Sequence, residues 1–422
     1  MHLLRQVTIA DRHSSFNGQT VDLLIENGLI AKIGPKLRKP KDCPVYSANG
    51  QWVSPGFLDI GAYLGDPGAE EREDVHSLAA AGQRGGYTQL AVLPNTDPVR
   101  HDKSGVEYLS RNSTALAVDL LPLGAVSRDT AGSEITEMID MQRAGAVGFT
   151  DGLHPIQSAG LLKLALQYVK GFGGTIINQP IDLSLAPHAQ LHEGPLSTRL
   201  GMPGFPIMSE TIALQRDLEI LAYTDSRLLV HLISTSAGLA LIKASRKQGL
   251  QVFSSVSAAH LQFTVDALEG FDPNYKLLPP LREERDRKAL VKAVVQGHID
   301  HIASHHQSHQ PEAKVLEFPY ADFGSQALET CVAQAYTVLG SQLAPDQFCA
   351  LFSHGPRKAL GLAARQIEVG QLADLSLFDP QQSWTPQPAD FGTKSVNSPL
   401  IGQQLQGRPV ATYHKEQLWT SA

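Results

Sequence analysis

The sequence predicts an α/β protein: a (β/α)8 TIM barrel that carries a small β-sandwich domain built from both chain ends. Short β-prone segments occupy the first 54 residues and return after residue 367. The stretch between them alternates apolar strands with helix-like segments, which is the pattern of a parallel barrel. The chain has 422 residues, 42% of them hydrophobic, and can bury one large core and a smaller one.

The chain ends are predicted to pair with each other. Asn17-Gly18 and Glu26-Asn27-Gly28 are turn sequences that separate the first β-prone runs. These runs are residues 7–9, 20–25 and 29–33, and similar ones return at 373–378 and 408–413. We therefore expect one composite β domain from residues 1–54 and 367–422, with the barrel inserted between them at 55–366.

Eight apolar segments are the candidate barrel strands. They lie at residues 57–60, 89–93, 118–123, 146–149, 175–177, 227–232, 251–256 and 301–303. One intervening helix is marked by the N-cap pair Ser234-Thr235, runs to Lys247 and stops at Gly249. Because a parallel barrel builds its site from the loops that follow its strands, those loops are where chemistry is expected.

Composition excludes several classes of protein. A net charge of −7 leaves no basic field for nucleic acid or an anionic membrane surface. No apolar run approaches the roughly 20 residues that span a bilayer, and no export signal begins the sequence. Cys43, Cys331 and Cys349 are too scattered for a disulfide scaffold or a thiolate zinc site. We expect a cytoplasmic protein.

Several short motifs follow the predicted strands in a fixed order. They are Pro55-Gly56-Phe57-Leu58-Asp59, Asp66-Pro67-Gly68, Leu93-Pro94-Asn95-Thr96, Gly148-Phe149-Thr150-Asp151-Gly152, His192-Glu193-Gly194, Ser234-Thr235, Pro279-Pro280-Leu281-Arg282 and Gly370-Gln371-Leu372-Ala373-Asp374-Leu375. In order and spacing, over nearly the whole chain, this set resembles the dihydroorotases, which are cyclic-amide hydrolases of the amidohydrolase superfamily. The resemblance implies a metal-dependent hydrolase barrel and a place in pyrimidine biosynthesis.

The metal ligands of that family are largely replaced. The resemblance implies a centre, normally zinc, whose first ligands come from an Asp-x-His-x-His-x-Arg pattern. Here that pattern reads Asp59-Ile60-Gly61-Ala62-Tyr63-Leu64-Gly65. The family's ligand positions hold Gly61, Tyr63, Asp151, Asn178, Leu232 and, at the catalytic aspartate, His305. Only Asp151 keeps a ligand-like carboxylate, so no metal is expected.

The positions that the resemblance assigns to the substrate are partly retained. Asn95 and His309 survive, whereas Gly65 and Leu278 replace an arginine and an asparagine. Without a metal no side chain generates hydroxide at neutral pH. His305 alone would contribute general-base effects of about 10²–10⁴-fold.

Each of these residues also has a structural interpretation. The histidines at 305, 306 and 309 are expected to form a polar loop rather than a relocated metal site. Asp59 and Asp151 are expected to cap local backbone amides, and Tyr63 and Leu232 to fill the space of metal and water. His231 is one residue away from the ligand position, and strand alternation then predicts that it points to the opposite face. His260 can be interpreted either as a hydrogen-bonded residue of the barrel rim or as a ligand. Residues 192–194 can form either a lid over the barrel mouth or a loop packed on itself.

Three hypotheses follow. The first is a dihydroorotase-like pseudoenzyme without a cofactor, which would act as a structural or regulatory partner of aspartate transcarbamoylase or as a homo-oligomer. The second is a working dihydroorotase or other cyclic amidohydrolase, with one zinc held by Asp151 and the histidines after the eighth strand. The third is a sensor that binds a small pyrimidine intermediate in the vacated pocket.

Overall fold

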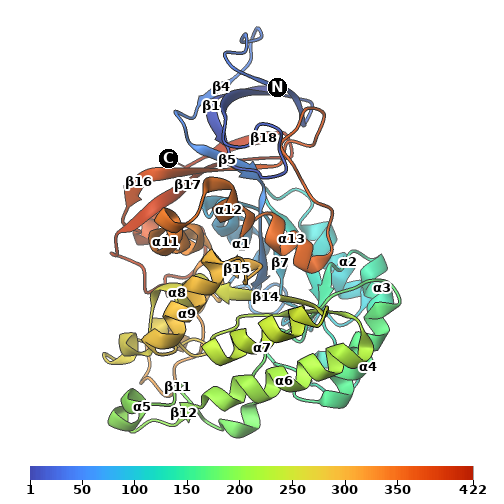
Figure 1. Ribbon diagram of the computed structural model, residues 1–422, viewed down its shortest axis with the longest axis vertical. Helices are drawn as coiled ribbons and strands as arrows, with labels where there is room; N and C mark the ends of the chain where they lie inside the picture. The colour runs from blue at the N-terminus through green and yellow to red at the C-terminus, as the bar shows by residue number, and fades with distance from the viewer. Residues whose placement is uncertain (422) are drawn as a thin grey trace.

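The computed structural model describes residues 1–421 and divides into a β sheet and a barrel with its surrounding helices (Figure 1). The blue and red ends of the ribbon lie together in the sheet, while the green and yellow helices surround the barrel. The eight strands of the sheet are β1 (His2–Ile9), β2 (Thr20–Glu26), β3 (Leu29–Gly34), β4 (Val45–Ser47), β5 (Trp52–Pro55), β16 (Leu375–Trp384), β17 (Leu405–His414) and β18 (Gln417–Thr420).

Strands from both chain ends pair directly in this sheet. Its order is β18-β17-β16-β5-β1-β2-β3, with β4 beside β1, so β5 joins the two halves. Leu23 and Val53 from one end are buried in the same core as Leu377 and Tyr413 from the other. The exact domain boundaries at 54/55 and 366/367 stay a prediction.

The barrel contains the eight strands that the sequence predicts, and that prediction is confirmed. They are β6 (Phe57–Ala62), β7 (Tyr87–Val92), β8 (Asp119–Gly124), β9 (Gly148–Phe149), β10 (Ile176–Asn178), β13 (Arg227–Val230), β14 (Gln251–Ser257) and β15 (His301–Ala303). Neighbours in the order β6-β7-β8-β9-β10-β13-β14-β15 are parallel. The seam between β6 and β15 is bridged where the Tyr63 N–H donates to the His306 carbonyl, 3.0 Å away.

Helices lie between the barrel strands and between the last of these strands and β16. They are α1 (Val75–Arg84), α2 (Lys103–Asn112), α3 (Met138–Arg143), α4 (Ala159–Lys170), α5 (Pro195–Leu200), α6 (Ile207–Thr224), α7 (Ser236–Lys247), α8 (Ala258–Gln262), α9 (Glu284–Val295), α10 (Pro311–Lys314), α11 (Leu328–Leu339), α12 (Pro345–Ala350) and α13 (His354–Leu360). Helix α7 starts and stops as predicted, because the Thr235 hydroxyl accepts from the Gly238 N–H at 3.0 Å. Within residues 1–421 no helix is both long and apolar enough to cross a membrane.

Two apolar layers position the site. Leu58, Ile60 and Leu229 belong to an inner cluster within the ring of strands. Leu228, Val230 and Ile302 belong to the larger cluster between strands and helices. Alternate residues of one strand therefore face different layers, and this alternation decides which side chains reach the barrel axis.

Candidate functional site

The candidate site lies where the eight barrel strands end, and Asp59 is its first polar residue. The Asp59 side chain is fully buried and accepts from the Ser304 N–H at 2.8 Å and the Ser304 hydroxyl at 2.5 Å. Burial raises the pKa of this carboxyl to about 6, against the effect of those two hydrogen bonds. Asp59 thus ties β6 to the end of β15, which is a structural use of the carboxylate.

The His231 ring lies directly beside Gly61 near the barrel axis. A Cβ built on Gly61 would lie 2.7 Å from His231 Nε2, which is closer than side chains tolerate. The His231 Nδ1 is 3.0 Å from the Ser255 hydroxyl, and burial lowers the imidazole pKa well below its ordinary value. The expectation that His231 faces away from the site is wrong. Leu229 already faces the inner cluster, so alternation carries His231 inward as well.

The other replaced positions after β6 and β13 are occupied by packing. Tyr63 is buried, and the Arg72 guanidinium lies over its ring, 4.5 Å from the centroid. Gly65 has no room for a side chain, because a Cβ there would collide with the backbone carbonyl of Ala69. Leu232 has a φ of +60° and lines the cavity at the axis, so it contributes apolar surface and no lone pair.

Asp151 and Asn178 are both engaged by protein groups. The Asp151 carboxylate accepts from the Ser127 N–H at 2.8 Å and the Ser127 hydroxyl at 2.6 Å. It therefore caps the loop after β8 rather than its own turn, and burial raises its pKa. The Asn178 side-chain amide donates to Asp217 at 2.7 Å, while its oxygen accepts from the Ile156 N–H at 3.0 Å. Neither side chain keeps a free ligand atom for the barrel axis.

The retained substrate-contact positions are also internally bonded. The Asn95 amide donates to the Asp151 carbonyl at 3.0 Å, and its oxygen accepts from the Leu153 N–H at 3.1 Å. The His309 Nδ1 lies 3.0 Å from the Arg72 guanidinium, and its Nε2 lies 2.9 Å from the Phe323 carbonyl. Since Arg72 can only donate, His309 is the Nε2-protonated neutral tautomer. Burial lowers its pKa to about 3. A substrate role for Asn95 and His309 stays a prediction.

The remaining histidines have different environments. His306 Nε2 lies 3.2 Å from the buried carboxylate of Glu73, and its Nδ1 accepts from the Ala327 N–H at 3.2 Å. His260 is satisfied by the Ser257 hydroxyl at 2.7 Å and the Pro280 carbonyl at 3.2 Å, which favours the rim interpretation. His305 differs, because its Nδ1 is buried without a hydrogen-bond partner and burial lowers its pKa to about 4.

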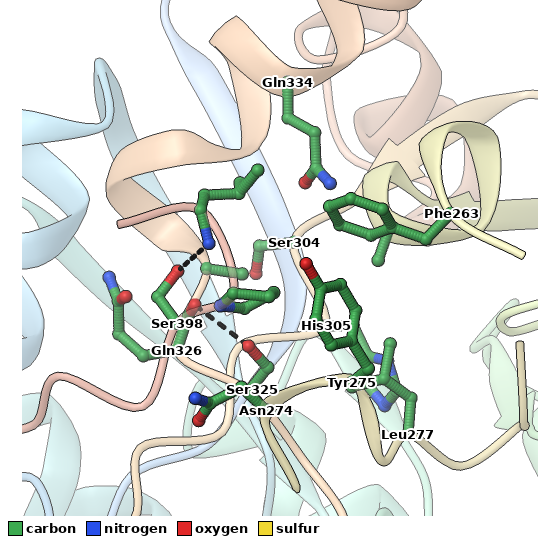
Figure 2. A pocket seen from close by; sticks show the side chains of 14 residues that line it. Phe263, Asn274, Tyr275, Leu277, Ser304, His305, Ser325, Gln326, Gln334 and Ser398 are labelled. Atoms are coloured by element: carbon green, nitrogen blue, oxygen red, sulfur yellow. Dashed lines mark hydrogen bonds between the residues drawn. The ribbon is translucent and has the colours of Figure 1, made fainter. Parts of the chain in front are cut away.

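Little free volume remains at the barrel axis. The cavity bordered by Gly61, His231, Leu232 and His305 offers about 20 Å³ to the centre of a water-sized molecule. One or two water molecules fill such a space. On its other side His305 borders a second cavity of about 20 Å³. In Figure 2 the Gln334 amide and the Tyr275 hydroxyl extend into that second cavity from opposite sides.

A buried ionic network explains why other motif residues persist. The Glu210 carboxylate accepts from the Ser234 N–H at 2.9 Å and the Thr235 N–H at 3.0 Å, and from both hydroxyls. Arg282 is fully buried and donates to the Ser234 hydroxyl and to His192 Nδ1, each at 3.0 Å. Burial, with Arg282 beside it, lowers the His192 pKa to about 4. His192 lies in β11 (Leu191–His192), which pairs with β12 (Gly204–Phe205), so residues 192–194 belong to a packed two-stranded unit.

The residues present do not fit a zinc centre at the expected positions. Gly61 and Leu232 offer no donor atom, and Asp151 and Asn178 have theirs engaged as described. Among the residues at these family positions, His305 retains a buried ring nitrogen without a partner. Across residues 1–421, no three histidine, cysteine or acidic side chains are grouped as a metal ion would need.

Comparison with known proteins shows which family this chain is similar to. A family model described as Dihydro-orotase-like matches residues 50–237. The dihydroorotase of Pelotomaculum thermopropionicum is 35% identical over 393 residues, covering 93% of this chain and 92% of that protein. The dihydroorotase of Carboxydothermus hydrogenoformans is 33% identical over 398 residues, covering 94% and 92%. The chain belongs to the dihydroorotase family.

Solved structures support the same fold for this dihydroorotase-family chain. The L-hydantoinase of Arthrobacter aurescens superposes with a TM-score of 0.85 at 22% identity, covering 99% of this chain and 96% of that one. A D-hydantoinase superposes with the same TM-score at 18% identity, covering 100% and 95%. These similarities confirm the predicted barrel with its additional β structure.

Sequence reasoning missed the residues that fill the space of the family's site. His231 and His301 lie inside the barrel, and His301 has neither ring nitrogen paired within the described residues. Glu210 and Asp217 on α6 hold the residues of the neighbouring strand ends. Alternation alone could not decide the direction of His231, because only the structure shows that Leu229 faces inward.

Proposed function

We propose that this chain is a non-catalytic member of the dihydroorotase family, with a structural or regulatory role in pyrimidine biosynthesis. The observation that carries the proposal is that the His231 ring fills the space that a side chain at position 61 would need. Where the family pattern has a metal-binding histidine, this chain has no side chain, and a second residue fills the gap.

The free volume supports the same proposal. About 20 Å³ at the barrel axis accommodates water but not a six-membered cyclic amide together with a metal-bound hydroxide. The donor atoms support it as well, because the retained Asp151 carboxylate is already satisfied by Ser127. Without a metal, the strongest remaining catalytic group is His305, a weak base at a pKa of about 4.

The test is metal content and turnover measured on one sample. The full chain is purified without chelator, its metal is quantified, and hydrolysis of dihydroorotate is assayed. The Pelotomaculum thermopropionicum dihydroorotase, prepared identically, is the positive control. We expect substoichiometric zinc and no turnover above the buffer rate, while stoichiometric zinc with turnover would overturn the proposal.

A second candidate is an active cyclic amidohydrolase with a reduced metal site. The unpartnered His305 Nδ1, which borders both cavities, is the observation in its favour. If turnover is found, His305→Ala and Asp151→Ala separate the two candidates. Loss of turnover in both variants would establish the altered site, and unchanged turnover in both would assign the activity to a contaminant.

The partner is proposed to be aspartate transcarbamoylase, or alternatively a second copy of this chain, and the location to be the cytoplasm. Support for the transcarbamoylase comes from the resemblance alone, since inactive chains of this kind assemble with that enzyme. Light scattering of the purified chain with and without the transcarbamoylase of the same organism tests it. A weight-average mass no higher than that of the unassociated mixture would count against it. The sensor hypothesis is tested by calorimetry of the chain against pyrimidine intermediates, and absence of binding to all of them would count against it.

A further inference from the structure

A wide groove opens beside the barrel mouth, outside the cavities already described. It has a volume of about 930 Å³. Its lining consists of residues 273–274, 309, 311, 314–317 and 394–397. Its lining comes from three separate parts of the chain, of which the segment 309–317, with α10 and the loop after it, contributes most. The groove is open on one side, so it is a surface feature and not a buried ligand chamber.

Apolar side chains are exposed in and around this groove. Val315 is 80% exposed, Val396 51% and Leu316 46%, and all three line it. Tyr320, on the same loop, is 75% exposed, and Phe271 packs edge-on against Phe318 with ring centroids 6.2 Å apart. Large apolar side chains scattered singly are normal on a surface, but a contiguous group around a groove marks an interaction site.

The loop that presents these side chains is held from beneath by two buried lysines. The Lys276 ammonium donates to the carbonyls of Phe318 at 2.8 Å and Ala321 at 2.6 Å. The Lys314 ammonium donates to the carbonyls of Asp322 at 2.7 Å and Gly324 at 2.8 Å. Burial lowers the pKa of Lys276 to about 8 and that of Lys314 to about 7. The loop is therefore fixed before binding, which reduces the entropy cost of association.

The charge around the groove is predominantly negative. Glu317 lines it and is exposed, and so are Glu312 and Asp322 on the same loop. Both lysines described above point inward to backbone carbonyls. Lys394, the remaining cation of the lining, is paired with Asp74 at 2.5 Å. Asp322 lies 3.6 Å from His309 Nδ1 and close enough to Lys276 and Lys314 for its charge to act on them, whereas Glu312 and Glu317 have no ion-pair partner among the described residues.

This charge decides between occupants. A second copy docking through the same face would bring two acidic rims together, since a twofold interface is made of one patch on both subunits. A partner with basic residues around an apolar anchor would instead meet both the groove and its rim with complementary groups. Aromatic and arginine side chains are also those that contribute most at protein interfaces.

We propose that this groove binds a segment of a different protein that presents an apolar or aromatic anchor flanked by arginine or lysine. The inference rests on the proposed function, because a chain kept for assembly needs a docking surface, and it names that surface. The exposed apolar residues contribute the anchor site, and Glu312 and Glu317 select for positive charge.

The test uses two synthetic peptides of equal length with a central Trp-Leu pair, flanked by arginines in one and by glutamates in the other. Fluorescence anisotropy of each labelled peptide is measured against the full chain. We expect the arginine peptide to bind, with affinity that falls as salt is raised, and the glutamate peptide not to bind. Leu316→Ser and Glu317→Lys are each expected to weaken binding at least tenfold, because both residues line the groove. Leu164→Ser removes an equally exposed leucine (46%) on α4, outside the groove, and is expected to leave binding unchanged.

Several outcomes would overturn the proposal. They are equal binding of both peptides, binding of neither, or equal effects of Leu316→Ser and Leu164→Ser. A dimer in sedimentation velocity that Leu316→Ser dissociates would assign the groove to a second copy instead. Dihydroorotate turnover by the same sample would overturn the proposed function but leave the groove assignment intact. If neither peptide binds and no turnover is found, the groove assignment is overturned and the proposed function is kept.

Discussion

Gly61→Ala is expected to destabilise the protein in a way that depends on His231. The Gly61 backbone has a φ of +94°, where a Cβ costs about 1–2 kcal/mol. That Cβ would also lie 2.7 Å from His231 Nε2, and such overpacking costs a further amount of about 1–3 kcal/mol. The total loss in the free energy of unfolding is therefore expected to be about 2–5 kcal/mol.

Removing the imidazole separates the two contributions. In a His231→Ala background the backbone cost of Gly61→Ala stays and the collision disappears, so we expect a coupling energy of about 1–3 kcal/mol. Gly249→Ala is the matched control, since its φ is +86° and a Cβ there meets nothing within 4 Å. It is expected to cost only the backbone part, in either background.

Urea unfolding followed by circular dichroism measures these quantities for the parent, the three single variants and both double variants. Equal costs of Gly61→Ala with and without His231 would refute the placement of His231 at the barrel axis. A Gly61→Ala cost no larger than that of Gly249→Ala would have the same meaning.

Buried polar groups lead to three other expected outcomes, all measured by urea unfolding. Asp151→Ala is expected to cost about 1–3 kcal/mol, because the Ser127 donors lose their buried acceptor, and parental stability would contradict that cap. Arg282→Met is expected to cost about 3–5 kcal/mol, because Glu210 keeps its buried charge, and a neutral effect would exclude the ionic network. Lowering the pH from 7 to 5 is expected to destabilise the protein. Five buried imidazoles have folded pKa values of about 3 or 4, below their unfolded value of 6.5. The unfolded state therefore binds more protons than the folded state as the pH falls through this window. The five imidazoles are His192, His260, His301, His305 and His309. Asp59 and Asp217, raised to about 6, act in the opposite direction between about pH 4 and 6. Burial also lowers the pKa of His231, so the imidazoles outnumber these two carboxyls and the net effect of acidification is a loss of stability. Stability that is flat over this range would contradict the buried neutral imidazoles.

Asp59 and Asp151 both cap backbone amides as the sequence predicts, but neither partner is local. Asp59 accepts from the Ser304 N–H, 245 residues away. Asp151 accepts from the Ser127 N–H, 24 residues away in the loop after β8. Nothing in the local sequence indicates these partners, because only the folded barrel brings them together.

The sequence by itself determined the eight strands, the pairing of the chain ends and the absence of the expected ligand residues, since each depends on local hydrophobic pattern or residue chemistry. Only the tertiary structure decided what fills the vacated site. His231 reaches Gly61 because β13 and β6 face each other across the barrel, although 170 positions separate the two residues. The same holds for the groove at Val315, where segments far apart in the chain meet above two buried lysines. Such contacts depend on the closure of the barrel, which no local stretch of sequence encodes.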